Sequence, residues 1–348
     1  MAKFNRRDFL QISAAVLGWA TLGELLAACG REISGTAQPI VLSPSPSKVA
    51  ISTASSIPTS TPPAAPTATR VSLPDVAVTR NGEPEVLVRR AIAALGGMQR
   101  FVGKDANVVV KPNICVAYHG YEYAATTNPW VVGTLVKMCF EAGAAKVQVM
   151  DYPFGGTAQQ AYKVSGIQEQ VEAAGGEMVE MSLLKYVTVD IPNAFHLKQA
   201  NYFGDVLKAD AVINVPIAKV HDLTRLTLGM KNLMGLVRDR PVMHAHISQN
   251  LADLASFVRP GLTVVDAVRV LVSNGPTGGS LDDVKKLDTV VASPDIVAAD
   301  SYAATLFGLQ PDDLGYITAG AAMGLGRSDL LRGGGGRRHL RSRSGLLR

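Results

Sequence analysis

The sequence predicts an α/β fold with largely parallel, helix-covered sheets, and two observations lead to this prediction. Short runs rich in branched apolar residues, such as 107–111 and 211–215, alternate with longer segments whose apolar residues recur at helical spacing. These short runs are apolar on both faces, as expected of parallel strands that are covered by helices on both sides. Polar residues directly follow several of the runs, and such sheets bind ligands beyond the carboxyl ends of their strands.

The first predicted strand is 107–111, and the helix that follows it begins at Asn128. Asn is a favourable N-cap, Pro129 suits the first turn, and Gly143 ends the helix. Further strands are predicted at 146–150, 177–181, 186–190, 211–215, 262–265 and 289–292. Further helices are predicted at 167–174, 224–233, 248–258 and 294–307. We expect two Rossmann-like lobes with a boundary at 201–210, where the chain enters its second set of strands.

Residues 1–29 have the features of an export signal with a lipid attachment site. Arg6 and Arg7 resemble the twin-arginine consensus and precede an apolar stretch, the layout of a secretory signal. The stretch ends in Leu-Ala-Ala before Cys29, which resembles a lipobox. As a transmembrane helix it is marginal in length and carries Glu24. The alternative is a buried N-terminal helix with a chance arginine pair.

This signal predicts where the protein is located and which partners handle it. We expect the twin-arginine translocase to export the chain, and lipoprotein-processing enzymes to cleave it before Cys29. A lipid on Cys29 would then anchor the protein on the outer face of the cytoplasmic membrane, or in the periplasm.

Composition divides the rest of the chain into three parts. Residues 30–75 are rich in Ser, Thr, Pro and Ala and lack apolar periodicity, so we expect a disordered tether. Residues 76–330 form the predicted core. Residues 331–348 carry six arginines and no acidic residue, which indicates a disordered basic tail or a frameshifted reading frame. Without these arginines the net charge of +5 falls to about −1, so we expect no nucleic-acid partner.

Besides Cys29, the chain contains Cys115 and Cys139. Neither lies in a C-x-x-C pair, so the ligands of a ferredoxin-type iron–sulfur cluster are missing and we expect no such cluster. The two cysteines could form one disulfide outside the cytoplasm. Cys139 falls on the apolar face of a predicted helix, which favours a buried free thiol at least as strongly.

Polar side chains follow four predicted strand ends, and these ends share one edge of a parallel sheet. The residues are Lys111, Asn113, Asp151, Lys219, His221 and Asp266. Each alone is compatible with turn or helix-cap chemistry. Together they predict a site for a small anionic ligand, with the lysines as charge partners and His221 as proton carrier.

The segment 219–246 is the densest in such residues. It adds Lys231, Asn232, His244 and His246, and Gly229 allows a close backbone approach. His244 and His246 lie on one side of an extended chain, as a metal-binding or acid–base pair would, although two histidines without a third ligand equally fit a polar surface. We therefore predict catalytic roles for His221, Lys231 and Asp266, substrate contacts from Lys111, Asn113, Asp151, Lys219 and Asn232, and transition-metal ligands at His244 and His246.

An ordered series of motifs across the core resembles the DUF362 family. These motifs lie at 111–113, 125–129, 141–143, 210–216, 219–221, 228–236, 259–266, 274–276 and 293–300. Many members of that family carry a ferredoxin module and are called iron–sulfur proteins. This chain departs from that pattern because it lacks the cluster cysteines.

A weaker likeness connects the chain with the nickel-pincer lactate racemase family. The interval from His221 to Lys231 is similar to that between a catalytic histidine and the cofactor-bearing lysine of that family, and His244 or His246 follows at a similar interval to a metal-binding histidine. The glycine-rich stretch before the lysine is missing, with 226–230 in its place. The resemblance implies Lys231 as cofactor anchor or cation, His221 as acid or base, and His246 as ligand.

These observations predict a cofactor- or metal-associated enzyme, redox or isomerase-like, that acts on a small anionic substrate. The alternative is a membrane-tethered protein that binds a small carboxylate or phosphate without catalysis. A surface lipoprotein with a purely structural role would not need this many polar strand-end residues.

Overall fold

The structure is a computed structural model that describes residues 73–330. The predicted signal with Arg6, Arg7 and Cys29, nearly all of the tether and the tail 331–348 lie outside the described residues. The described residues belong to one compact unit. Within them, no helix combines the length and apolar character needed to cross a membrane.

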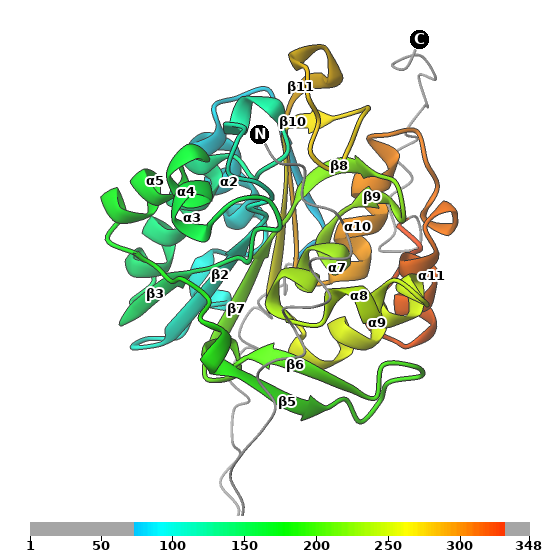
Figure 1. Cartoon of the computed structure of the whole chain (residues 1–348). Coiled ribbons are helices and arrows are strands. Elements are labelled where there is room, and N and C mark those ends of the chain that lie inside the picture. Colours follow the sequence, from blue (N-terminus) through cyan, green and yellow to red (C-terminus); the bar gives the residue numbers. More distant parts are fainter. Residues whose placement is uncertain (1–72, 331–348) are drawn as a thin grey trace, which may run out of the picture. The chain divides into compact units, whose positions relative to one another are not determined.

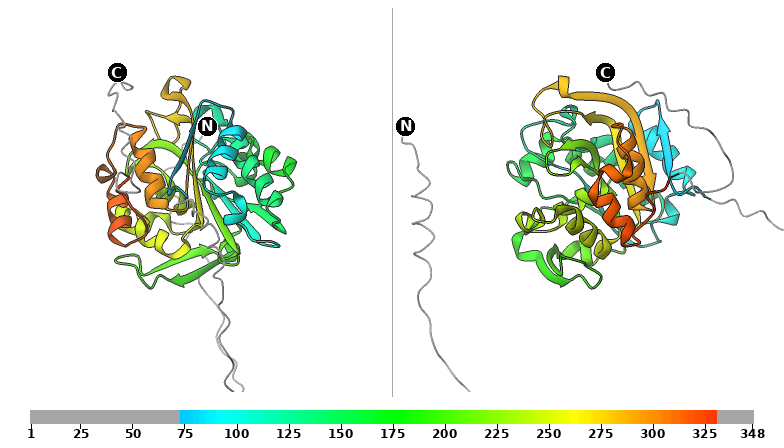
Figure 2. Two further views of the ribbon diagram at one scale, coloured as in Figure 1. Left: turned by 180° about the vertical axis from the view of Figure 1, so that it is seen from behind. Right: turned by 90° about the vertical axis from the view of Figure 1, so that its right-hand side faces the viewer.

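A mostly parallel sheet forms the centre of this unit (Figures 1 and 2). It has nine strands. Its main path runs β1-β11-β10-β7-β2-β3-β4, and β8 and β9 extend it from β10. The strands are β1 (Ala77–Arg80), β2 (Asn107–Pro112), β3 (Lys146–Val149), β4 (Glu177–Met178), β7 (Ala211–Val215), β8 (Ile217–His221), β9 (Arg225–Thr227), β10 (Leu262–Leu271) and β11 (Val284–Ser293). Neighbouring strands on the path β10-β7-β2-β3-β4 are parallel, and β10 is also parallel to β8. The pairs β1–β11, β10–β11 and β8–β9 are antiparallel.

Helices cover both faces of this sheet, which confirms the predicted fold class (Figure 1). On one face lie α2 (Pro84–Ala94), α3 (Pro129–Glu141), α4 (Ala158–Val164) and α5 (Ile167–Ala173). On the other lie α7 (Gly229–Asn232), α8 (Arg240–Met243), α9 (Ile247–Val258), α10 (Ile296–Thr305) and α11 (Gly315–Ala322). Within β2, Val108 and Val110 pack in one core cluster and Val109 in the other, because successive side chains of a strand point to opposite faces.

A small antiparallel pair, β5 (Tyr186–Asp190) and β6 (Gln199–Phe203), lies beside the main sheet and leads into α6 (Gly204–Leu207). The predicted lobe boundary at 201–210 falls here. The next strand, β7, pairs with β2, so the residues on both sides of that boundary share one sheet. The described core is therefore built on one central sheet.

Several predicted elements appear at the expected residues. Helix α3 begins after Asn128, whose side chain accepts a hydrogen bond from Trp130 N at 3.0 Å, and Gly143 follows its end with a φ of +98°. The predicted helix at 224–233 is wrong. Its first part forms β9, because Thr227 pairs with Lys219 across a hairpin, and only Gly229–Asn232 becomes helical.

Candidate functional site

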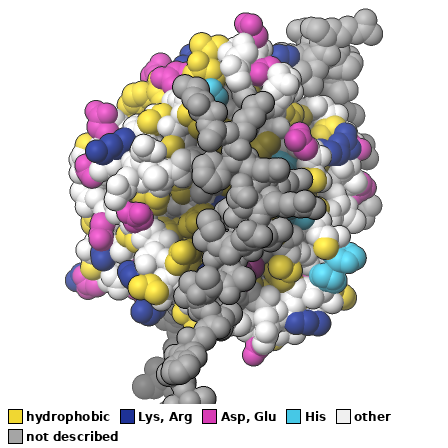
Figure 3. Space-filling view, in the orientation of Figure 1, with side chains coloured by type: hydrophobic (Ala, Val, Ile, Leu, Met, Phe, Trp, Pro, Cys, Tyr) yellow, Lys and Arg dark blue, Asp and Glu magenta, His cyan; other side chains and the backbone are white. Residues whose placement is uncertain are grey.

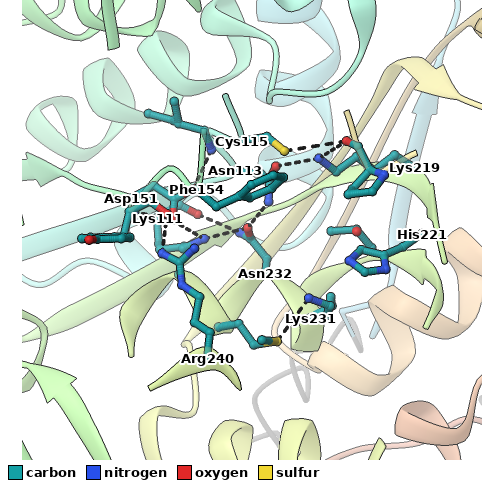
Figure 4. Close-up of a pocket in the computed structure, with 16 residues that line it drawn as sticks. Lys111, Asn113, Cys115, Asp151, Phe154, Lys219, His221, Lys231, Asn232 and Arg240 are labelled. Atoms are coloured by element: carbon teal, nitrogen blue, oxygen red, sulfur yellow. Dashed lines mark hydrogen bonds and ion pairs between the residues drawn. The ribbon is translucent and has the colours of Figure 1, made fainter. Parts of the chain in front are cut away.

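A small pocket of about 70 Å³ opens where β2, β3 and β8 end, and α7 forms another of its walls (Figure 4). One buried water needs about 10–15 Å³ on a comparable measure, so the pocket holds several water-sized groups. It brings together seven of the predicted residues: Lys111, Asn113, Asp151, Lys219, His221, Lys231 and Asn232. The predicted edge of the sheet is therefore where these side chains meet.

Lys111 and Asp151 form a buried ion pair at the base of the pocket. Their side chains are 1% and 4% exposed, and Lys111 Nζ lies 2.9 Å from Asp151 Oδ1. Burial lowers the pKa of Lys111 to about 8, although Asp151 acts in the opposite direction. Asp151 also accepts hydrogen bonds from the backbone N–H groups of Ile114 at 2.6 Å and Tyr152 at 2.8 Å, so its oxygens are already engaged by the protein.

Asn232 links this ion pair to α7. Its Oδ1 accepts hydrogen bonds from Lys111 Nζ at 2.7 Å and from Asn113 Nδ2 at 3.0 Å. Its Nδ2 donates to Asn214 Oδ1 at 2.9 Å and to the carbonyl of Lys111 at 3.2 Å. Because every polar atom of the Asn232 side chain is used in this way, the residue fixes the floor of the pocket.

Lys219, on β8, is held by three protein oxygens. Its Nζ donates to the carbonyl of Ala125 at 2.6 Å, to the carbonyl of Pro276 at 2.9 Å and to Asn113 Oδ1 at 3.1 Å. A lysine has three donors, so these bonds use all of them. Lys219 therefore contributes a positive field to the pocket rather than a free hydrogen-bond donor.

Lys231, on α7, has a different environment. Its Nζ donates to Met234 Sδ at 3.1 Å, and a thioether is a weak acceptor. Its pKa is lowered to about 8, mainly by burial and then by the charges of Lys219, Arg240 and Lys111. Lys231 is therefore a cation with donors that no oxygen of the described chain accepts, facing a pocket that is already positive.

His221, at the end of β8, lies on the side of the pocket opposite Arg240 (Figure 4). Its Nδ1 accepts a hydrogen bond from the backbone N–H of Leu223 at 3.1 Å, so the neutral ring carries its proton on Nε2. Burial and the positive charges of Lys231 and Lys219 lower its pKa to about 3. At neutral pH His221 is thus a neutral hydrogen-bond donor rather than a cation.

Two further lining residues, Arg240 and Thr227, were not among the predicted site residues. Arg240 lies over the Tyr152 ring, with 4.6 Å from Cζ to the ring centroid, and donates from Nη2 to the carbonyl of Tyr152. Its Nε is buried and has no hydrogen-bond partner among the described residues, and the same holds for Thr227 Oγ1. Both residues line the pocket, and these two atoms lack a partner that a ligand would supply. Arg240 stands in the dense segment 219–246, and this density was the only sequence signal for it.

Asp300 on α10 holds the first turn of helix α7 in position. The carboxylate of Asp300 accepts hydrogen bonds from the backbone N–H groups of Gly229 at 2.6 Å and Met230 at 3.0 Å. Burial raises its pKa to about 7. A Cβ on Gly229 would lie 2.7 Å from Asp300 Oδ1, so the glycine permits this close approach, as the sequence predicted. Asp300 acts through the backbone and sets where Lys231 lies.

Three predicted site residues do not line the pocket. The sequence placed Asp266 at a strand end, but β10 continues to Leu271, so Asp266 lies within the strand. It is fully buried and accepts hydrogen bonds from Asn128 N at 2.7 Å and Val268 N at 2.9 Å, and burial raises its pKa to about 6. His244 and His246 are exposed, and the His246 ring lies 4.1 Å from that of His196.

The donors in and around the pocket do not fit a transition-metal centre. Across residues 73–330, no three His, Cys, Asp or Glu side chains are grouped so that they could hold a metal ion. The imidazole of His221 and the thiol of Cys115 line the pocket, while Asp151 is engaged by Lys111 and two amides. Cys115 and Cys139 are both buried free thiols, and burial raises the pKa of Cys139 to about 12.

Charges of both signs are interspersed over the coloured part of the face seen in Figure 3. The concentration of positive charge is instead inside the pocket, which Lys111, Lys219, Lys231 and Arg240 line together with the single carboxylate of Asp151. With one carboxylate among four cationic side chains, the pocket is electrostatically suited to an anion.

Known proteins resemble this chain at several levels. A thylakoid-associated protein of Synechocystis sp. is 29% identical over 248 residues, which cover 68% of this chain and 74% of that protein. Among solved structures, the lactate racemase apoprotein of Thermoanaerobacterium thermosaccharolyticum matches 66% of this chain with a TM-score of 0.45 and 12% identity. A Thermotoga maritima protein matches 65% with a TM-score of 0.36 and 13% identity. The matches cover 56% and 60% of those two solved chains.

The family assignment rests on a match to a family model rather than on these structures. The model of DUF362, described as a domain of unknown function, matches residues 108–305, which is more than half of the chain. All the pocket residues described above lie within this range. The chain therefore belongs to the DUF362 family, as its series of sequence motifs predicted.

Proposed function

We propose that this protein is an enzyme that binds a small oxyanion in the pocket and transfers a proton to or from it. The observation that carries the proposal is the environment of Lys231, a partly buried amine whose one acceptor among residues 73–330 is the sulfur of Met234 at 3.1 Å. A lysine with a pKa of about 8 is close to the neutral pH at which a general acid or base works best.

The pocket residues divide this work between them. Lys231 and the free Nε–H of Arg240 bind the negative oxygens of the ligand, and Lys111 and Lys219 add positive field from fixed positions. His221 donates its Nε2–H to an oxygen of the ligand. In its neutral fraction Lys231 keeps two N–H donors for the ligand, while its lone pair accepts a proton from the ligand and later returns it, so no net charge is left on the enzyme.

This division differs from the expected roles in one respect. The sequence suggested His221 as the acid–base group and Lys231 as a cation or cofactor anchor. With pKa values of about 3 for His221 and about 8 for Lys231, the lysine is the better proton acceptor near neutral pH. A bound anion would raise both values, because it stabilises the protonated forms.

Two measurements on the purified protein test the proposal. Titration with acetate and phosphate, followed by ligand-observed NMR, should detect binding that Lys231→Met weakens at least tenfold. Lys146→Met is the matched control, since Lys146 is exposed and pairs with Glu177 outside the pocket. Incubation with a panel of small carboxylates in D₂O should then show deuterium exchange next to the carboxylate, and Lys231→Met should abolish it.

The outcomes separate the enzyme from its alternative. Binding without exchange for every acid in the panel would support a tethered receptor for a small carboxylate or phosphate. Equal binding by the wild-type protein and by Lys231→Met would refute the assignment of the pocket. Elemental analysis of the same protein tests the prediction of a transition metal at His244 and His246.

We also propose that the protein is exported and lipid-anchored. The support is the sequence at Arg6, Arg7 and Cys29. In cells, Cys29→Ala should move the protein from the membrane fraction to the soluble fraction, and replacing Arg6 and Arg7 with Lys should leave the uncleaved chain inside. Membrane association that is unchanged by Cys29→Ala would rule out the lipid anchor.

A further inference from the structure

The pocket changes in character at its mouth. Its interior is lined mainly by charged and amide side chains, but Tyr152 and Phe154, which follow β3, are 38% and 59% exposed and line the same pocket. Figure 4 shows the Phe154 ring among these polar side chains. An exposed aromatic ring at the edge of a binding pocket provides apolar area that a ligand can cover.

A second exposed ring lies beside Phe154. Tyr118 is 59% exposed, and a Cβ on Gly155 would lie 3.2 Å from Tyr118 Cε1, so the tyrosine ring rests against the backbone that follows Phe154. Tyr118 also makes an edge contact with His119, with ring centroids 4.8 Å apart. His119 stacks on Tyr123 at 4.4 Å, so the Tyr118 ring is supported from behind.

The two loops that carry these rings are joined by backbone hydrogen bonds. Phe154 N–H donates to the carbonyl of Cys115 at 3.1 Å, and Ala117 N–H donates to the carbonyl of Gly155 at 2.8 Å. Val116 and Gly155 form a parallel bridge between the loops. The two loops are therefore joined to each other before a ligand arrives, which lowers the entropic cost of binding.

We propose that the oxyanion bound by this pocket is carried on an aromatic ring, which Phe154 contacts at the mouth and Tyr118 contacts just beside it. The inference rests on the proposed function, since it assumes that the charged head of the ligand lies near Lys231 and Arg240. A pocket of about 70 Å³ accommodates that head, and the remainder of a larger ligand must leave past Phe154. Thr227, 3% exposed and with a buried Oγ1 that has no partner among the described residues, independently indicates that the interior receives a polar group.

The test compares matched anions with and without a ring. Full-length protein is titrated with acetate and phenylacetate, and with phosphate and phenyl phosphate, and affinities are measured by ligand-observed NMR. Both pairs are needed because the head can be a carboxylate or a phosphate. A ring–ring contact adds about three- to tenfold in affinity beyond the area that it buries. We expect at least one ring-bearing anion to bind ten or more times tighter than its parent.

Variants assign this gain to the mouth of the pocket. Phe154→Ala should reduce the ratio between the ring-bearing anion and its parent about tenfold, and Tyr118→Ala should reduce it by a smaller factor. Phe195→Ala is the matched control, because Phe195 is 71% exposed and does not line the pocket. It should leave the ratio unchanged.

The possible failures are distinct. If acetate or phosphate binds and Lys231→Met weakens it, but the ring adds nothing, this inference is wrong and the proposed function stands. A ring-dependent gain that survives both Phe154→Ala and Tyr118→Ala also overturns it. If none of the four anions binds to the wild-type protein, the proposed function fails as well.

Discussion

Replacement of Asp151 by Asn tests the electrostatic design of the pocket, because it leaves the ammonium of Lys111 buried without its counter-charge. The two side chains are 1% and 4% exposed and lie 2.9 Å apart. Removing one partner of a buried ion pair costs about 3–5 kcal/mol. In a protein of this size, 1 kcal/mol shifts Tm by about 2–4 °C. We therefore expect Asp151→Asn to lower Tm by about 6–20 °C.

The pH dependence of this loss provides a sharper test. Without Asp151, the pKa of Lys111 falls below its present value of about 8, whereas in the unfolded chain it returns to the ordinary value of 10.5. The unfolded state then binds more protons than the folded state, so the stability of the variant rises with pH over this interval. The penalty should be clearly smaller at pH 9 than at pH 6.

Guanidinium unfolding of the wild-type and variant proteins at both pH values measures the effect. The double variant Lys111→Met/Asp151→Asn should recover at least about 1 kcal/mol of the loss, since it buries no charge. Glu177→Gln, which breaks the exposed pair with Lys146, is the control and should cost less than about 1 kcal/mol. A loss below 1 kcal/mol for Asp151→Asn, or a double variant no more stable than the single one, would refute the reasoning.

Three further predictions follow from the same region. Asp300→Asn should flatten the fall in unfolding free energy that wild type shows between about pH 4 and pH 7, because a carboxyl whose pKa is raised to about 7 stabilises the fold only while protonated. Urea unfolding at pH 5 and pH 8 measures this fall, and an unchanged pH dependence in the variant would contradict the prediction. Gly235→Ala should lower the free energy of unfolding by about 1–3 kcal/mol and abolish anion binding, since an added Cβ would overlap Asp151 Oδ1 and lie 2.7 Å from Lys111 Nζ. Gly261→Ala is the control: an added Cβ there has nothing within 4 Å, so the free energy of unfolding should change by less than about 0.5 kcal/mol. The affinity of wild type for the anion should fall as pH rises through about 8, where Lys231 loses its proton. Lys231→Arg should hold the affinity constant to higher pH. An affinity of wild type that does not change with pH would argue against Lys231 as the group that binds the anion.

Much of the fold was predictable because its signals are local. The apolar run at 107–111 can be buried on both faces only as a central strand, and the Asn-Pro start of α3 encodes its own N-cap. The stretch 224–233 has apolar spacing that suits a helix, but its first part forms β9 because β8 is available as a pairing partner. That pairing is a tertiary contact, which local sequence does not encode.

The site could be predicted in outline for a different reason. Lys111, Asp151 and Lys219 were found because parallel strands end at one edge, so their order along the chain was enough. Asp266 lies within a strand rather than at the predicted strand end, because the length of β10 depends on its antiparallel partner β11, which continues past Asp266. No strand-end pattern marks Arg240, because it lies on a short helix, far in sequence from any strand end.

The four cations of the pocket are subject to different evolutionary constraints. Lys111 and Lys219 are bound to oxygens of the protein itself, so replacing either one damages folding whatever the ligand is. Lys231 and Arg240 keep donors that no described oxygen accepts, so ligand recognition rather than folding constrains them. Among relatives that have diverged to different ligands, we therefore expect the first pair to be retained and the second pair to vary with the ligand.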